Sequence, residues 1–260
     1  MEEIGKPVIL CTIIETQGST PRHEGSKMLV FKDGSTMGTI GGGELEHRVI
    51  QAALEAFIER KPRRVKYSMV NPERGDPGVC GGELEVFVEP VLPKNKLVII
   101  GAGHVGKEVA FLGRWLGFYV VMYDDRQEFS KPDFVPDSDE YFSGDFKNMI
   151  DKIKLDSWTN VVLTTRNIEL DIKILPDILN SDTPYIGVIG SKKRWETTKK
   201  TLLEMGLPIE QIQRIYSPIG LDLNAETPRE IALSILSEII MVQRNDIKKQ
   251  VNSLSQPSKK

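Results

Sequence analysis

The stretch Lys96–Ala110, KLVIIGAGHVGKEVA, decides the fold of the second half of the chain. Its apolar run leads into the spacing G-x-G-x-x-G and then into helical periodicity, which predicts a buried strand, a tight turn and a helix. In such a unit Gly101 allows the turn, Gly103 lets a pyrophosphate approach the backbone, and Gly106 lets the helix pack on the strand. The helix begins near His104, whose backbone matters more here than its ring, and its free N–H groups favour an anion.

A second apolar run follows where a dinucleotide-binding βαβ unit requires one. Phe118–Tyr123 predicts the next parallel strand, and Asp124 and Asp125 end it about 23 residues after Gly101, where an acid that binds ribose is expected. Arg126 is close enough to tolerate a 2′-phosphate there. The order of these features predicts a Rossmann-like, doubly wound parallel sheet. An α/β fold whose crevice stays empty is the alternative for function.

Composition narrows the class of protein. The 260 residues suffice for two domains, and the net charge of −3 gives no electrostatic footprint for nucleic acid. No apolar run reaches the roughly 20 residues of a membrane span, and the first residues do not resemble a signal peptide. We therefore expect a cytoplasmic protein with two reduced cysteines and no nucleic-acid or membrane partner.

The first half of the chain predicts a small α+β domain of its own. Runs typical of strands occupy Pro7–Glu15, Lys27–Phe31, Thr36–Ile40, Arg63–Val70 and Glu83–Glu89, and a helix follows residue 43. The prolines of Pro90–Pro93 interrupt both ladder and helix, so this segment is the expected linker. The predicted organisation is an N-terminal domain over residues 1–93, a Rossmann-like domain over 94–246 and a disordered tail over 247–260.

Glycine-rich loops in the first half are candidate binding sites. Gly18, Ser19 and Thr20 follow the first predicted strand in a loop without apolar period. Gly41, Gly42 and Gly43 precede a helix, so their N–H groups could form a nest for an anion. A tight strand-to-helix turn explains these glycines equally well, and the acidic residues that follow them would repel a phosphate.

Cys80 is the candidate metal ligand. It lies between a loop dense in turn formers and Gly81-Gly82, which favours an accessible thiol, whereas Cys11 lies in an apolar run and is expected in the core. One cysteine without a partner is a poor metal site and an incomplete nucleophile. As a soft ligand to molybdenum or to sulfur of a bound cofactor it is chemically sensible. The alternative is a cysteine that merely fits between glycines.

Two later segments are expected to open onto the same crevice. Thr165–Asp171 follows the strand predicted at residues 160–164, and Gly190 and Ser191 follow the strand that begins at Tyr185. Ligands bind at such strand ends in open α/β sheets. The acids of the first segment could instead only charge the N-terminus of the next helix.

With both halves interpreted, the chain resembles the XdhC/CoxI family of xanthine dehydrogenase accessory proteins, which serve molybdenum hydroxylases. The motifs that carry the resemblance are Gly18–Arg22, Gly38–Glu46, Cys80–Gly82, Gly101–Gly106, Asp124–Arg126, Ile186–Lys192 and Ser217–Leu221. Family members often show T-H-x-H-x-x-D after the fourth strand of the second domain. Thr165–Asp171 keeps only the threonine and the aspartate, so a paralogue that serves another hydroxylase is an alternative.

The resemblance implies a maturation factor that binds the molybdenum cofactor, a pterin dithiolene carrying molybdenum, in its mononucleotide or dinucleotide form. It implies protection of the sulfurated cofactor, contact with a cysteine desulfurase and delivery to an apo-molybdenum hydroxylase. The expected cofactor-binding residues are Gly18, Ser19, Thr20, Gly41, Gly42, Gly43, Cys80, Gly101, Gly103, His104, Gly106, Asp124, Asp125, Arg126, Gly190 and Ser191. No catalytic residue is assigned, and the sequence leaves open whether the chain forms a homodimer.

An NAD(P)-dependent oxidoreductase is the alternative from another class of function. The unit from Gly101 to Asp125 supports it, but only His23, His47 and His104 could supply histidine acid–base chemistry. No nucleophile, base and orienting group are assembled in the pattern. We therefore expect a protein that carries a cofactor rather than one that turns over a substrate.

Overall fold

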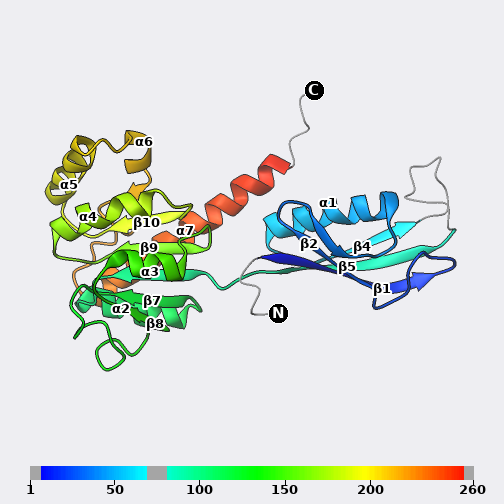
Figure 1. The fold of residues 1–260 in the computed structure, drawn as a ribbon, viewed down its shortest axis with the longest axis horizontal. Helices are drawn as coiled ribbons and strands as arrows, with labels where there is room; N and C mark the ends of the chain where they lie inside the picture. The colour runs from blue at the N-terminus through cyan, green and yellow to red at the C-terminus, as the bar shows by residue number, and fades with distance from the viewer. Residues whose placement is uncertain (1–6, 69–80, 255–260) are drawn as a thin grey trace. The chain divides into compact units, whose positions relative to one another are not determined.

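The structure is a computed structural model that describes residues 7–68 and 81–254. It divides into two compact units, which we describe separately (Figure 1). The first unit comprises the residues up to Pro93 together with those from Asp246 onward, and the second unit comprises Lys94–Asn245. An antiparallel sheet with a helix forms the first unit and a parallel sheet with helices the second, which confirms the predicted fold class.

In the described residues, the first unit has a five-stranded antiparallel sheet on which helix α1 packs. Its strands follow the order β3-β2-β1-β5-β4, and the buried face of α1, which is Leu45, Val49, Ala53 and Ala56, belongs to the same core cluster as Cys11. The elements are β1 (Val8–Gln17), β2 (Lys27–Phe31), β3 (Thr36–Gly38), α1 (Gly43–Glu59), β4 (Arg63–Ser68) and β5 (Glu83–Val91). The predicted hairpin between β2 and β3 is confirmed, with Met28 paired to Gly38.

The predicted linker begins too early, because β5 continues to Val91. Pro90 pairs with Ile9 of β1, while β4 begins opposite Val88. Pro90 therefore lies where β5 has a neighbouring strand on one side only, a position at which a missing N–H is tolerated. The two prolines of the predicted linker suggested that the strand would stop before Pro90. The ladder continues because Pro90 has a paired strand on one side only.

The second unit is a six-stranded parallel sheet in the order β11-β10-β9-β6-β7-β8. Its strands are β6 (Lys96–Ile100), β7 (Tyr119–Tyr123), β8 (Glu140–Phe142), β9 (Thr159–Leu163), β10 (Tyr185–Val188) and β11 (Ile215–Tyr216). The direction in which strands are added reverses between β6 and β9. Ligands of doubly wound sheets bind at the carboxyl ends of the strands at this point.

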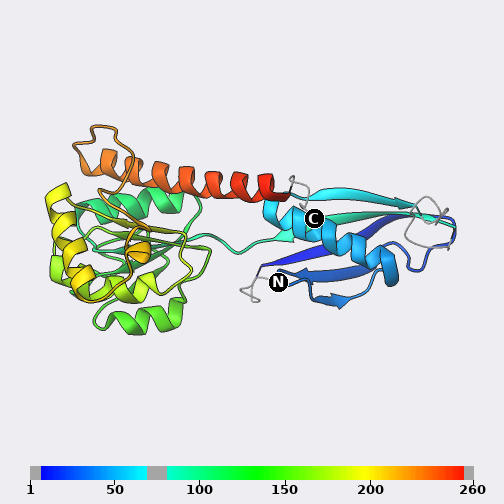
Figure 2. The same ribbon diagram turned by 90° about the horizontal axis from the view of Figure 1, so that it is seen from above.

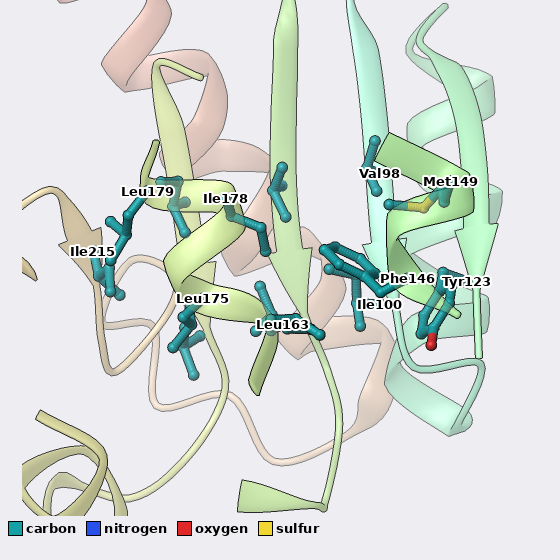
Figure 3. Packing of buried hydrophobic residues seen from close by; sticks show 14 of the residues in the cluster. Val98, Ile100, Tyr123, Phe146, Met149, Leu163, Leu175, Ile178, Leu179 and Ile215 are labelled. Carbon is teal, nitrogen blue, oxygen red and sulfur yellow. The ribbon is translucent and has the colours of Figure 1, made fainter. Parts of the chain in front are cut away.

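Helices cover both faces of this sheet (Figure 2). Helix α2 (His104–Trp115) and helix α7 (Pro228–Leu254) pack on one face. Helices α3 (Phe146–Ile153), α4 (Ile168–Leu179) and α5 (Lys192–Glu204) contribute to the core of the other face, and the short helix α6 (Ile209–Ile212) follows α5. Figure 3 shows this second core, in which Phe146 and Met149 of α3 and Ile178 of α4 meet side chains of the strands.

Helix α7 extends into the segment predicted as a disordered tail. It begins as predicted, because the N–H of Glu230 donates to Thr227 Oγ1 (3.3 Å) and the N–H of Thr227 donates to Glu230 Oε2 (2.9 Å). It ends only at Leu254, although the polar composition of residues 247–260 predicted disorder. Polar residues such as lysine and glutamine are good helix formers, and extending an existing helix is far easier than starting one. No helix within residues 7–68 and 81–254 has both the length and the apolar character that a membrane span requires.

Candidate functional site

A cavity of about 1000 Å³ opens at the carboxyl ends of β6 and β9, where the strand order reverses. Residues of the glycine turn, the end of β7, the loop after β9 and the turn before α5 line it. The predicted site residues that it brings together are Gly101, Gly103, His104, Asp124, Asp125, Arg126 and Gly190. Gly106 lies behind the turn and is buried, and Ser191 caps α5 by accepting the N–H of Arg194 at 3.2 Å. The predicted crevice therefore has the shape of a binding site.

The three glycines of the turn have different geometric roles. Gly101 has φ +108°, and a Cβ on it would lie 3.0 Å from the backbone of Thr164 at the end of β9. A Cβ on Gly106 would lie 2.0 Å from the carbonyl oxygen of Gly101, so the helix can approach its own turn only without a side chain there. A Cβ on Gly103 would meet nothing within 4 Å, and Gly103 lines the cavity. Only the second glycine leaves open space that a ligand can use.

Asp124 holds the turn in place. Its side chain is 2% exposed, and its Oδ2 accepts the N–H of Ala102 at 2.9 Å. Arg126 donates to the same carboxylate from Nε (2.9 Å) and from one terminal nitrogen (3.1 Å). Burial raises the pKa of Asp124, but the hydrogen bonds from Arg126 and Ala102 outweigh it and hold the pKa below its ordinary value. Asp125 is half exposed and is the acid that remains accessible to a ligand.

An aromatic wall, which sequence reasoning missed, lines one side of the cavity. The Arg126 guanidinium lies 3.8 Å from the ring centroid of Phe129, and Phe129 meets Phe134 edge to face at 4.6 Å. The Lys107 ammonium lies 3.3 Å from the centroid of Phe134. The segment between β7 and β8 has no apolar period, so nothing in its pattern distinguishes these rings from those of any loop. The sequence offers one signal for them, which is that two phenylalanines stand among charged residues just after the acids that follow β7.

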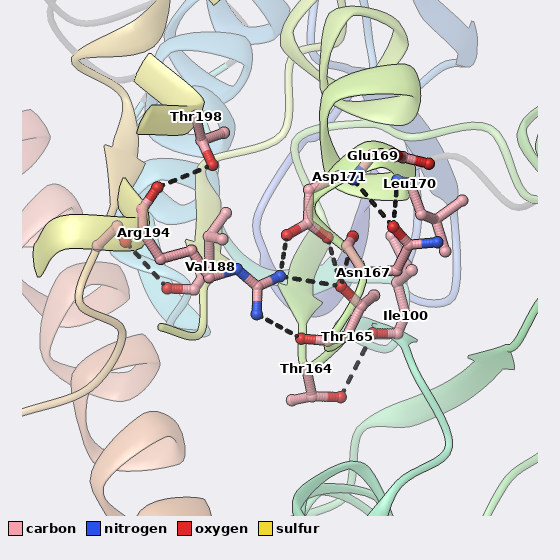
Figure 4. Close-up of polar contacts among 11 residues, drawn as sticks. Ile100, Thr164, Thr165, Asn167, Glu169, Leu170, Asp171, Val188, Arg194 and Thr198 are labelled. Carbon is pink, nitrogen blue, oxygen red and sulfur yellow. Dashed lines mark hydrogen bonds and ion pairs between the residues drawn. The ribbon is translucent and has the colours of Figure 1, made fainter. Parts of the chain in front are cut away.

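Arg194 joins the far walls of the cavity (Figure 4). Its guanidinium forms an ion pair with Asp171, which is fully buried, and donates to the carbonyl oxygen of Thr165 at 3.0 Å. Thr165 in turn donates its hydroxyl to Asp171 Oδ1 at 2.5 Å, and Thr164 donates to the carbonyl oxygen of Gly101 at 2.7 Å. The loop after β9 is thus tied to α4, to α5 and to the glycine turn. Asp171 does more than charge a helix terminus.

The glycine-rich loops of the first unit meet at one end of its sheet. A Cβ on Gly82 would lie 2.3 Å from the carbonyl oxygen of Ser19, and a Cβ on Gly41 would lie 2.5 Å from Pro21 Cγ. Gly18, at φ +75°, lies beside Gly82 in the same way. The loop after β1 therefore touches both the start of β5 and the turn before α1. Cys80 lies outside the described residues, directly before this junction in the sequence.

The predicted anion nest at Gly41–Gly43 is closed by the protein's own carboxylate. Glu46 Oε1 accepts the N–H of Ile40 (3.0 Å), the N–H of Gly42 (2.9 Å) and the hydroxyl of Thr39 (2.5 Å). Burial raises the pKa of Glu46, but these hydrogen bonds lower the pKa by more, so it lies below its ordinary value. The tight-turn interpretation accounts for these glycines, and Glu46 occupies the N–H groups of Ile40 and Gly42 that the predicted phosphate nest would use.

The cysteine predicted in the core is confirmed there. Cys11 is fully buried, and burial raises the pKa of its thiol to about 12. Within residues 7–68 and 81–254 no group of three or more histidine, cysteine or acidic side chains could hold a metal ion.

Two family models match the chain in succession. Residues 2–68 match the XdhC and CoxI family, and residues 97–239 match the XdhC Rossmann domain. The chain belongs to the XdhC and CoxI family. The second match spans the whole sheet that carries the cavity, from β6 into α7.

Known relatives of this XdhC-family chain match nearly all of it, but the matched part is a different share of each relative's own length. The uncharacterized protein YqeB of Escherichia coli (strain K12) is 34% identical over 247 residues, which are 94% of this chain but 45% of YqeB. The molybdenum cofactor insertion chaperone PaoD of the same organism is 22% identical over 268 residues, 92% of this chain and 84% of PaoD. A crystal structure described as a xanthine dehydrogenase from Bacillus halodurans is 26% identical, with a TM-score of 0.51 and 92% of each chain covered. This chain therefore spans less than half of YqeB.

The segment Thr165–Asn167 forms part of the wall of the cavity. Arg166 is exposed and lines the cavity. Asn167 caps α4, since its Oδ1 accepts the N–H groups of Glu169 (2.9 Å) and Leu170 (3.3 Å). Asn167 thus fixes the loop at the start of α4, and Arg166 presents a guanidinium to the cavity.

Proposed function

We propose that this chain binds the molybdenum cofactor and passes it, in sulfurated form, to an apo-enzyme of the xanthine dehydrogenase type. The similarity to PaoD, a molybdenum cofactor insertion chaperone, and to the Bacillus halodurans protein described as a xanthine dehydrogenase supports this class of function. The observation that carries it for this chain is the cavity of about 1000 Å³ over a turn built to approach a phosphate. The proposal places this transfer in the cytoplasm.

The residues of the turn fit the phosphate end of such a cofactor. Gly103 leaves its Cβ position empty, and among the described residues no side chain caps α2 by a hydrogen bond. The first N–H groups of α2 are therefore available to an anion, with Lys107 and Arg166 as cations on the same cavity. When bound, the cofactor supplies molybdenum and its terminal sulfur to the acceptor enzyme. The chain's own residues bind the phosphate, orient the cofactor and shield it from water.

Cys80 is proposed as the soft ligand that contacts molybdenum or its terminal sulfur. Two observations support this proposal. One is the sequence around Cys80, and the other is the close approach of Gly18 and Ser19 to Gly82, which follows Cys80 in the chain. A thiolate suits a soft metal centre better than an oxygen ligand does. A cysteine desulfurase is proposed as the source of the terminal sulfur.

Retention of the cofactor tests the proposal directly. The full chain is produced in a host that makes the molybdenum cofactor and purified by gel filtration, and molybdenum and oxidised pterin are then quantified. We expect both to co-elute with the protein, to be lost in Gly103→Val and to persist in Phe111→Ala. Phe111 is 56% exposed on α2 and does not line the cavity, which makes it the control. Absence of molybdenum and pterin even after adding the cofactor would contradict the proposal.

A separate experiment tests Cys80. Cys80→Ser should keep the melting temperature of the parent protein but lose molybdenum retention and the ability to activate an apo-hydroxylase. Full cofactor load and transfer in Cys80→Ser would mean that the cysteine only fits between its neighbours.

The Rossmann strand order favours one other candidate, an NAD(P)-dependent oxidoreductase. It requires hydride transfer, and the histidine on the cavity, His104, is the first residue of α2. Oxidation of NADH or NADPH by the purified chain in the presence of aldehydes, ketones or purines would favour this candidate over a carrier.

A further inference from the structure

We infer that the cavity of the second unit binds a nucleoside diphosphate, with its base stacked on the Arg126 guanidinium and its ribose on Asp125. This inference rests on the proposed function and deepens it, because it assigns the bound cofactor to the dinucleotide form. A phosphate monoester could use the glycine turn alone. The wall beside the turn distinguishes the two forms.

The wall is a continuous row of cation–ring and edge-to-face ring contacts. It runs from Arg126 over Phe129 and Phe134 to Lys107, with successive separations of 3.8, 4.6 and 3.3 Å. All four residues line the cavity. The wall thus connects the end of β7 with the first turns of α2, and it lies beside the turn that would hold a diphosphate.

The orientation of the Arg126 guanidinium is fixed by contacts within the protein. Its Nε and one terminal nitrogen form a fork on Asp124, and Asp124 is fixed by the N–H of Ala102. The ring of Phe129 supports the guanidinium, yet the Arg126 side chain remains 52% exposed. Planar guanidinium groups are favourable stacking partners for nucleobases. A base can therefore bind here with little loss of side-chain freedom, because the guanidinium is already ordered.

The sugar position follows from the two aspartates. The Asp124 oxygens accept from the backbone of Ala102 and from the side chain and N–H of Arg126, which leaves little capacity for a ribose hydroxyl. The Asp125 side chain is 50% exposed, and its Oδ1 lies 4.0 Å from Arg126 Nε. It is the acceptor beside the proposed base position. Base, ribose and diphosphate then follow one another from Arg126 past Asp125 to Gly103.

Isothermal titration of the full chain with CDP, GDP, ADP and inorganic pyrophosphate tests this arrangement. We expect at least one nucleoside diphosphate to bind about tenfold more tightly than pyrophosphate, since stacking of one base gives a gain of this size. Phe129→Leu and Arg126→Lys keep apolar character and charge, respectively, but remove the plane. Both should lower the affinity for the nucleoside diphosphate about tenfold and leave that for pyrophosphate unchanged. Phe111→Leu, outside the cavity, is the matched control and should change neither affinity.

The outcomes separate this inference from the proposed function. Equal affinities for pyrophosphate and every nucleoside diphosphate, or equal losses for both in Phe129→Leu, would overturn the base-binding wall. So would the absence of any nucleoside diphosphate binding in a chain that retains molybdenum and pterin, and the proposed function would then stand. A chain that binds a nucleoside diphosphate through Arg126 but never retains molybdenum would keep the wall and overturn the proposed function instead.

Discussion

The carboxylate of Asp124 accepts the backbone N–H of Ala102 at 2.9 Å, so the end of β7 fixes the conformation of the glycine turn after β6. The pattern of the sequence placed an acid at this strand end to bind ribose. The structure gives the first of the two acids to the protein itself and leaves the second, Asp125, accessible.

Asp124→Asn should destabilise the second unit in a pH-dependent way. At pH 7 we expect a loss of about 1–3 kcal/mol, the usual range for a hydrogen bond to a charged group. The pKa of Asp124 is depressed in the folded protein, so its stabilisation is present above the unfolded pKa of about 4 and disappears as the pH falls through the folded pKa. Guanidinium unfolding followed by tryptophan fluorescence reports this unit, because Trp115, Trp158 and Trp195 all belong to it. A loss of the same size at pH 7 and pH 3 would contradict the assignment.

Substitution by alanine should destabilise the protein at Gly106 but hardly change its stability at Gly103. Gly106→Ala forces a Cβ against the Gly101 carbonyl oxygen and should cost at least about 2 kcal/mol. Gly103→Ala finds open space at φ −70° and should change stability by less than about 1 kcal/mol. Thermal unfolding of the two variants checks the contrast, and equal destabilisation would mean that the turn is packed differently.

Glu46→Gln should destabilise the first unit by about 1–2 kcal/mol at pH 7, because the amide loses the charge that strengthens three hydrogen bonds. The depressed pKa of Glu46 means that this stabilisation is present above the unfolded pKa and is lost as the pH falls through the folded pKa. Hydrogen exchange of the Gly42 amide is the local measurement. Glu44→Gln, on the exposed side of the same helix turn, is the control and should leave that exchange rate unchanged.

Cys11→Ser should lower the free energy of unfolding by about 1–3 kcal/mol, because it places a hydroxyl in the apolar core of the first unit. With a thiol pKa of about 12 and no exposure, Cys11 should also resist alkylation at pH 8. In Cys80→Ser protein, labelling with iodoacetamide should therefore require denaturant. Rapid labelling of that variant in its native state would show that Cys11 is accessible.

Asp171→Leu should destabilise the second unit by about 3 kcal/mol, since it leaves the Arg194 guanidinium in a largely buried place without its ion-pair partner. The double variant Asp171→Leu/Arg194→Met should recover part of this loss. A double-mutant cycle measured by denaturant unfolding gives the coupling between the two side chains. Additive losses would show that the pair does not act as a unit.

The Rossmann-like unit could be predicted from the sequence because each of its decisive features is local. The apolar run before Gly101, the glycine spacing and the acids after Tyr123 lie within one βαβ unit, and the structure places them as expected. The capping box at Thr227 is local in the same sense.

Features that depend on tertiary partners could not be predicted. The acidic residues after Gly43 indicated that a phosphate would be repelled, but the pattern did not show that Glu46 itself would accept the N–H of Gly42. The place of Pro90 inside β5 depends on where β4 begins, which only the register of the sheet determines. The wall from Phe129 to Lys107 depends on the path of an irregular loop across the first turns of α2. These differences arise from contacts that exist only once the backbone has folded, and no periodicity or residue spacing reports them.

The empty Cβ position at Gly103 separates two kinds of selection. Folding requires glycine at positions 101 and 106, whereas at position 103 the backbone conformation and the surrounding space accept a side chain. A library of variants sorted only for cellular abundance should therefore tolerate many residues at position 103. The same library sorted for delivery of an active partner enzyme should return glycine. The identity of this one residue is set by what the cavity holds and not by the need to fold.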